Sequence, residues 1–147
     1  MKIKIYAMFI LSLLTINNLL IAQTNPRTLF KSFSITDCDN IYSTISKDME
    51  IVEWDYPYVR FHITVNFENG NESMLKAAIM DGRYSVSSIQ ENNMIIFKND
   101  QLNKKLIMNG VEIKEKVKIK VFVPKGKSLG EFSKAVIEEN NLEETSL

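Results

Sequence analysis

One histidine, His62, and one cysteine, Cys38, are the first candidates for chemistry in this chain. A general-base histidine needs a serine or cysteine nucleophile and an orienting carboxylate. We expect no Gly-x-Ser-x-Gly nucleophile elbow, and the sequence leaves a Cys38–His62 pair open only as a possibility of distance. Alternation along the chain places His62 on a polar strand face beside Arg60 and Thr64, where a solvated side chain is expected. We therefore predict that the protein is not an enzyme. A hydrolase using His62 with an Asp or Glu is the weakest alternative.

Metal and redox chemistry find little support in the same residues. A lone cysteine forms no internal disulfide, and Cys38 is expected to be a small buried or turn residue rather than a reactive thiol. Residues 37–40, Asp-Cys-Asp-Asn, cluster oxygen atoms but lack the glycine and ligand spacing of a calcium loop. One cysteine and one histidine cannot hold zinc without carboxylates. We expect no metal and no cofactor.

Two groups of surface residues are better candidates, and both point to binding. Trp54, Tyr56 and Tyr58 could form an aromatic platform for a sugar ring or a peptide if they share a face, although Trp54 could instead close the end of the core. A basic stripe on the charged parity of one strand comprises Lys114, Lys116, Lys118 and Lys120. The stripe could meet anionic glycans or lipopolysaccharide phosphates, or it could simply keep a solvent-facing strand soluble and discourage aggregation.

The composition and the N-terminal residues indicate where in or outside the cell the protein acts. The chain has 147 residues, with 18 basic and 18 acidic side chains, so it carries no basic footprint for nucleic acid. Lys2 and Lys4 precede an apolar run, 5–14, and a second short run ends at Ala22. This pattern predicts a signal peptide over 1–22, cleaved before Gln23, and a secreted, periplasmic or cell-envelope protein without a transmembrane segment.

Period-two alternation predicts a mainly β domain over 30–127, after a flexible lead over 23–29. The clearest strands are Val59 to Phe67 and a single long strand from Val111 to Val123, in which only Glu115 interrupts the apolar parity. Shorter strands are expected at 32–35, 41–45, 50–54, 84–89, 94–97 and 105–108. The Asn109-Gly110 pair predicts a tight hairpin that joins the last of these to the long strand.

One segment breaks the β pattern. Asn71 can cap a helix that runs to Met80, and Gly82 suits the left-handed residue that follows it. A weaker helical pattern runs from Leu129 to Asn140, inside a charged tail over 128–147. The predicted fold is therefore mainly β with one short helix. A solenoid or roll of stacked strands is the first choice, and a β-sandwich is the alternative.

The string from Ile51 to Arg60, a strand ending in Trp-Asp, then a turn and a long alternating strand, resembles secreted bacterial adhesin-type domains, also called adhesin-head or GIN-type domains. The helix 74–80, the Asp81-Gly82 turn and the strand end 121–124 extend the resemblance over roughly residues 30–127. The resemblance implies a solenoid-like β body, action at the cell surface and no catalytic residues.

These observations predict a non-enzymatic, secreted or envelope-associated binding or structural domain whose partner is an envelope or surface component, either glycan or protein. The alternative is a small-ligand-binding or inhibitor-like periplasmic module with a pocket beneath the helix 71–80. A deep apolar cavity would favour the alternative, whereas a filled core with an exposed aromatic or basic face would favour the binding domain.

Overall fold

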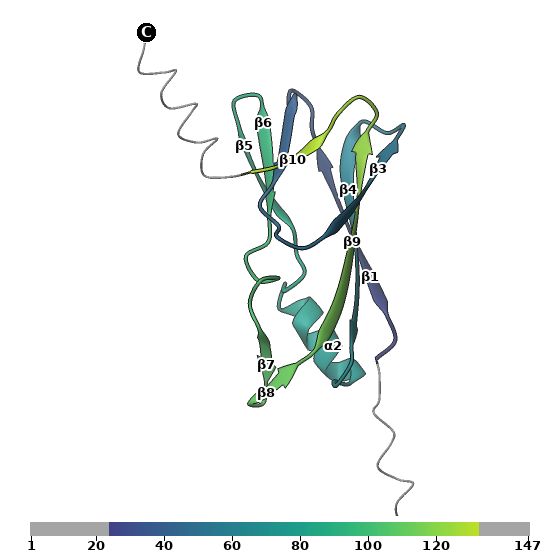
Figure 1. The fold of residues 1–147 in the computed structure, drawn as a ribbon, viewed down its shortest axis with the longest axis vertical. Helices are drawn as coiled ribbons and strands as arrows, with labels where there is room; N and C mark the ends of the chain where they lie inside the picture. The colour runs from purple at the N-terminus through teal and green to yellow at the C-terminus, as the bar shows by residue number, and fades with distance from the viewer. Residues whose placement is uncertain (1–23, 133–147) are drawn as a thin grey trace, which may run out of the picture.

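The computed structural model describes residues 24–132, so the predicted signal peptide and most of the charged tail lie outside the described residues. The described chain is mainly β, with one short helix, as predicted (Figure 1). The strands are β1 (Arg27–Ser34), β2 (Asn40–Ser43), β3 (Met49–Trp54), β4 (Tyr58–Phe67), β5 (Ser87–Glu91), β6 (Met94–Lys98), β7 (Leu106–Met108), β8 (Val111–Ile113), β9 (Glu115–Pro124) and β10 (Leu129–Glu131). The helix is α2 (Glu72–Met80), which is too short to span a membrane, and no other helix occurs in the described part of the chain.

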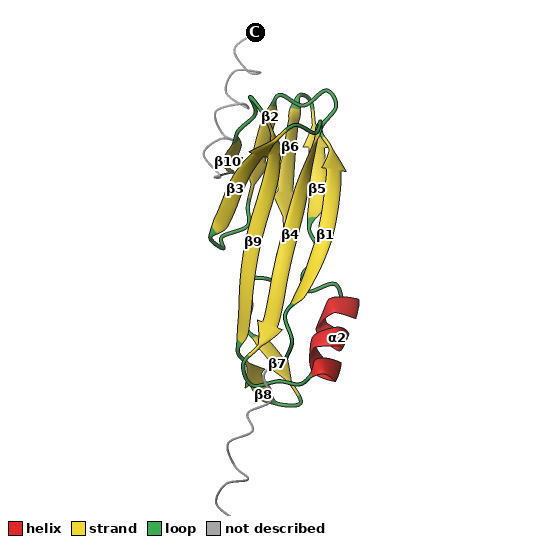
Figure 2. Cartoon of the chain, turned by 90° about the vertical axis from the view of Figure 1, so that its right-hand side faces the viewer, coloured by secondary structure: helices red, strands yellow, loops and turns green. Residues whose placement is uncertain are grey.

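Two four-stranded sheets make up the body. Sheet A has the order β1-β4-β9-β3 and sheet B the order β10-β2-β6-β5, while β7 and β8 form a separate hairpin. The sheets lie face to face, with sheet A in front in Figure 2. Strands distant in sequence, such as β4 and β9, are direct neighbours. No repeating coil of successive strands occurs among residues 24–132, so the first-choice solenoid is not seen, and the arrangement is compatible with the alternative, a sandwich.

Alternation along β4 and β9 explains the core. Every second residue of β4, from Val59 to Phe67, is buried, and Ile119, Val121 and Val123 of β9 are buried beside them. Because successive strand side chains point to opposite faces, the intervening residues must lie on the outer face of sheet A. The inner side of sheet A therefore forms the core, and no other described element covers its outer side (Figure 2).

The strands β4 and β9 are longer than those of sheet B and extend past its lower end (Figure 1). There the inner face of sheet A is covered by α2 and the β7–β8 hairpin instead of by a second sheet. Leu75 and Ala78, on one face of α2, are buried in the same core as Phe67. Core side chains therefore fill the space between α2 and sheet A.

The local predictions for the helix and hairpin are confirmed. The side chain of Asn71 accepts a hydrogen bond of 2.9 Å from the backbone N–H of Met74, which caps α2, and Gly82 has a φ of 77°. Asn109 and Gly110 both have positive φ, at 51° and 76°, as a type I′ turn requires. The turn joins β7 to β8, which are paired antiparallel as expected.

Four expected segments differ from the structure. The long strand predicted over 111–123 is divided at Lys114, where Asn69 accepts the backbone N–H at 2.7 Å, so β8 pairs with β7 and β9 with β4. The predicted lead over 23–29 is only partly a lead, because β1 begins at Arg27 and pairs with β4.

At the other end of the domain, β10 occupies the start of the expected helix 129–140, because residues 129–131 pair in parallel with β2; the remainder of that helix lies outside the described residues. The strand expected over 84–89 begins only at Ser87. Tyr84 instead follows α2 in a turn.

Candidate binding face

The outer face of sheet A carries a continuous row of aromatic rings, which we call the aromatic band: Phe30, His62, Phe122, Trp54, Tyr56 and Tyr58. The ring centroids of Phe30 and His62 are 4.5 Å apart, and those of His62 and Phe122 also 4.5 Å. Phe122 lies 5.2 Å from Trp54, which is 4.9 Å from Tyr56 and 4.7 Å from Tyr58. The band crosses all four strands, from the edge strand β1 to the turn between β3 and β4.

Strand register explains how these distant residues meet. Phe30 lies directly opposite His62, and Phe122 lies opposite Arg60 on one side and Val52 on the other. His62 and Phe122 are therefore diagonal neighbours, which is within the reach of aromatic side chains. The step from Phe30 to His62 goes straight across, whereas the steps from His62 to Phe122 and from Phe122 to Trp54 each move one strand across and two residues along. The band therefore runs obliquely over the sheet.

Trp54, Tyr56 and Tyr58 are brought together, as their proposed role as a platform required. Trp54 donates its indole N–H to the carbonyl oxygen of Tyr58 at 2.9 Å, which closes the β3–β4 turn. Trp54 is half-buried on the outer face and is absent from the core, whereas Tyr56 is 57% exposed. The interpretation in which Trp54 closes the end of the core is therefore wrong.

Arg60 is held in the same cluster by contacts that leave its charge unneutralised. Its guanidinium lies 5.4 Å from the ring centroid of Trp54 and 5.2 Å from that of Tyr58, and it donates to the hydroxyl oxygens of Ser32 and Tyr58. No carboxylate pairs with it among residues 24–132. Arg60 is thus a positioned cation at the edge of the aromatic band.

His62 is not the solvated strand residue that the alternation suggested. It is half-buried between the rings of Phe30 and Phe122, and its Nε2 is buried without a hydrogen-bond partner. Burial lowers the pKa of His62, and the nearby charges of Arg60 and Lys120 lower it further. The imidazole therefore acts as a neutral ring within the band.

The four lysines of the predicted stripe do not share one environment. Lys116, Lys118 and Lys120 lie on the outer face of β9, whereas Lys114 lies at the break before it. Lys116 pairs with Glu68 at 2.7 Å and Lys120 with Glu50 at 2.8 Å. Lys118 is exposed, opposite Thr64, and has no ion-pair partner within the described chain. Of the three on this face, only Lys118 has a charge free for a ligand.

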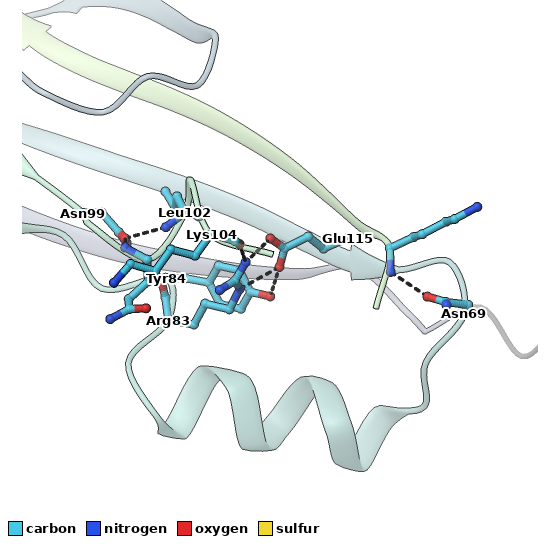
Figure 3. Close-up of polar contacts among 9 residues, drawn as sticks. Asn69, Arg83, Tyr84, Asn99, Leu102, Lys104 and Glu115 are labelled. Atoms are coloured by element: carbon cyan, nitrogen blue, oxygen red, sulfur yellow. Dashed lines mark hydrogen bonds and ion pairs between the residues drawn. The ribbon is translucent and has the colours of Figure 1, made fainter. Parts of the chain in front are cut away.

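A buried polar cluster, which the sequence did not predict, lies inside the domain between sheet A and α2 (Figure 3). Arg83 donates to both carboxylate oxygens of Glu115, at 2.9 and 2.6 Å, and also to the carbonyl oxygen of Lys104. The hydroxyl of Tyr84 donates to Glu115 at 2.7 Å. Burial and the Glu115 carboxylate raise the pKa of Tyr84 well above its ordinary value. This cluster joins the end of α2 to the start of β9, and its donors and acceptors are satisfied within the protein.

The remaining sequence candidates do not form a catalytic set. Cys38 is buried in the core between the sheets, as predicted, whereas His62 lies on the outer side of sheet A. Asp39 accepts from Asn93 and Lys127. No group of three or more potential metal-ligating side chains occurs in the described part of the chain.

Residues 126–130 read Gly-Lys-Ser-Leu-Gly, which matches the nucleophile-elbow pattern that the sequence was expected to lack. That expectation was wrong for the pattern itself. However, Gly126, Lys127 and Ser128 lie between β9 and β10, and Leu129 and Gly130 begin β10, whereas a nucleophile elbow joins a strand to a helix. Ser128 is exposed in this connection, and its side chain makes no hydrogen bond to His62 or to a carboxylate within residues 24–132.

An open groove of about 630 Å³ lies at the opposite edge of the domain from α2. It runs beside β3 and β10 and is lined by residues 43–49, 51 and 129–132. None of these residues belongs to the helix. The groove is therefore not the pocket beneath α2 that the small-ligand alternative required.

Comparison of the chain with protein-family models, curated proteins and solved structures found no match. The resemblance to adhesin-type domains therefore remains an expectation drawn from the sequence.

Proposed function

We propose that this protein is a non-enzymatic binding domain that acts outside the cytoplasm, at the cell envelope, through the outer face of sheet A. The observation that carries the proposal is the aromatic band, which crosses four strands on a face that no other described element covers (Figure 2). Phe30 and Tyr56, at its two ends, are 64% and 57% exposed. Large aromatic side chains left on a solvent face, together with a positioned arginine, are typical of recognition surfaces.

The filled space beneath α2 supports this proposal over the small-ligand alternative. Leu75 and Ala78 are buried against the core there, and the Arg83–Glu115 pair closes the space next to the helix. A small-ligand site needs an enclosed cavity lined by a few converging polar groups. The exposed band offers the opposite, an extended surface suited to a large partner.

The proposed location at the cell envelope rests on the predicted signal peptide. Co-sedimentation with envelope fragments tests both this location and the role of the outer face of sheet A. The full chain is incubated with envelope fragments of the source cells, and the bound fraction is compared between the original protein and Tyr56→Ala and Phe30→Ala. Ile107→Ala is the matched control, because Ile107 is 63% exposed on β7, away from sheet A. We expect both band variants to lose binding and the control to keep it. Equal binding by all four proteins would refute the proposal.

A further inference from the structure

We propose that the ligand of this face is an acidic polysaccharide, whose sugar rings stack on the aromatic band while its carboxylates pair with Arg60 and Lys118. This inference rests on the proposed function and adds the chemical class of the ligand to it. Its evidence is the shape of the band and the charge beside it.

The band is long and narrow. It crosses three inter-strand spacings of about 4.8 Å, so it spans roughly 14 Å across the sheet. Polar residues border it along the sheet, with Ser32 and Arg60 toward the β3–β4 turn and Thr64 and Lys118 toward α2. A stable protein interface needs about 800 Å² from each partner, with an apolar centre and a polar rim. From Phe30 to Phe122 the band is one ring wide, and it widens only at the turn, where Trp54, Tyr56 and Tyr58 contact one another. Such an outline suits a linear chain of sugar rings better.

The outer face of sheet A carries a net positive charge, and its unpaired cations occupy two defined positions. Lys116 and Lys120 are neutralised by Glu68 and Glu50, which leaves the charges of Arg60 and Lys118 without acidic partners in the described structure. Arg60 lies opposite Phe122, whereas Lys118 lies opposite Thr64, two residue pairs beyond His62. The two cations therefore stand on opposite sides of the band, where the acidic groups of a ligand lying along it would find them.

The same charges argue against a second copy of the chain as the occupant. Two copies packed face to face would each contribute Arg60 and Lys118 to one interface, and like charges juxtaposed across an interface oppose association. A neutral glycan would stack on the rings but leave both cations without partners. An acidic glycan satisfies the rings and the cations together.

The test measures the affinity of the full chain for three probes by titration calorimetry: an oligogalacturonate, a neutral gluco-oligosaccharide of equal length and poly-L-glutamate. We expect the oligogalacturonate to bind most tightly and to weaken as salt is added. Tyr56→Ala and Lys118→Gln should each lower its affinity by about twofold to tenfold. Lys76→Gln is the matched control, because Lys76 is an exposed lysine on α2 with no ion-pair partner within residues 24–132, and it should change nothing.

The outcomes separate the ligand class from the face. Absence of saturable binding to the oligogalacturonate, or equal binding of poly-L-glutamate, would overturn the acidic-glycan inference. If envelope binding still depended on Tyr56 in that case, the proposed face would stand and only its ligand class would fail. Tighter binding of the neutral probe would also overturn the inference, since it would show that Arg60 and Lys118 contribute nothing.

Discussion

Removal of the Glu115 carboxylate should destabilise the domain more than any surface substitution, because it leaves a charge buried. The side chains of Arg83 and Glu115 are 8% and 13% exposed and are joined by two hydrogen bonds. In Glu115→Ala the guanidinium keeps only the carbonyl oxygen of Lys104 as a partner. Breaking a buried pair from one side typically costs about 3–5 kcal/mol, a large share of the 5–15 kcal/mol that stabilises an ordinary domain.

The assay is equilibrium urea unfolding at pH 7, followed by far-UV circular dichroism. Lys105→Gln serves as the surface control, because the Lys105–Glu112 pair is exposed on both sides and should contribute under about 1 kcal/mol. A third variant combines Arg83→Met, Glu115→Leu and Tyr84→Phe, which removes the three polar side chains of the cluster at once. We expect it to be more stable than Glu115→Ala, since no buried charge remains. A loss below about 1 kcal/mol in Glu115→Ala would refute this reasoning.

Three further predictions concern single residues. The pKa of His62 is lower in the folded state than its ordinary 6.5, so near that pH the unfolded chain binds more protons than the folded chain. The free energy of unfolding should therefore decrease as the pH is lowered from 7.5 to 5.5. Paired urea titrations should show a smaller decrease in His62→Gln. Asn71→Ala should lower stability by about 1 kcal/mol because it removes the N-cap acceptor of α2, whereas Asn71→Asp should retain it, both read from thermal melts. Gly82→Ala should cost about 1–2 kcal/mol in the same melts, because its φ of 77° is left-handed, while Ala77→Gly in the exposed helix interior should cost about 1 kcal/mol or less.

Local patterns in the sequence predicted the elements well. The alternation in β4 emerged as a buried row because one face of that strand meets the core throughout its length. The caps of α2 and the Asn109-Gly110 turn depend on neighbouring residues only, and both were confirmed. Pairing between distant strands was not predictable in this way. Whether β1 lies beside β4, or β3 beside β9, depends on how the side chains of all the strands pack together in the core. The choice between solenoid and sandwich depends on that pairing.

The binding face was predictable only in part. Trp54, Tyr56 and Tyr58 are close in sequence, so their meeting at one turn could be foreseen. Phe30 and Phe122 join them only through strand register, and neither strand pattern marks them as neighbours of His62. Phe122 did carry a visible sign, because it interrupts the charged parity of its strand.

Glu115 interrupts the apolar parity in the same way, and its partner proved to be a buried arginine. That partner could not be inferred from β9, because Arg83 reaches it from the end of α2. An interruption of alternation thus marked each position, but the pairing that explains it came only from the structure.

The most direct test of the binding face uses Trp54, the only tryptophan in the chain, which lies within the aromatic band. Acrylamide quenching of its fluorescence is measured for the full chain, free in solution and bound to envelope fragments of the source cells. Binding should protect Trp54 from the quencher, because the ligand covers the rings beside it. If Trp54 in the bound protein is quenched as readily as in the free protein, the aromatic band is not the binding face.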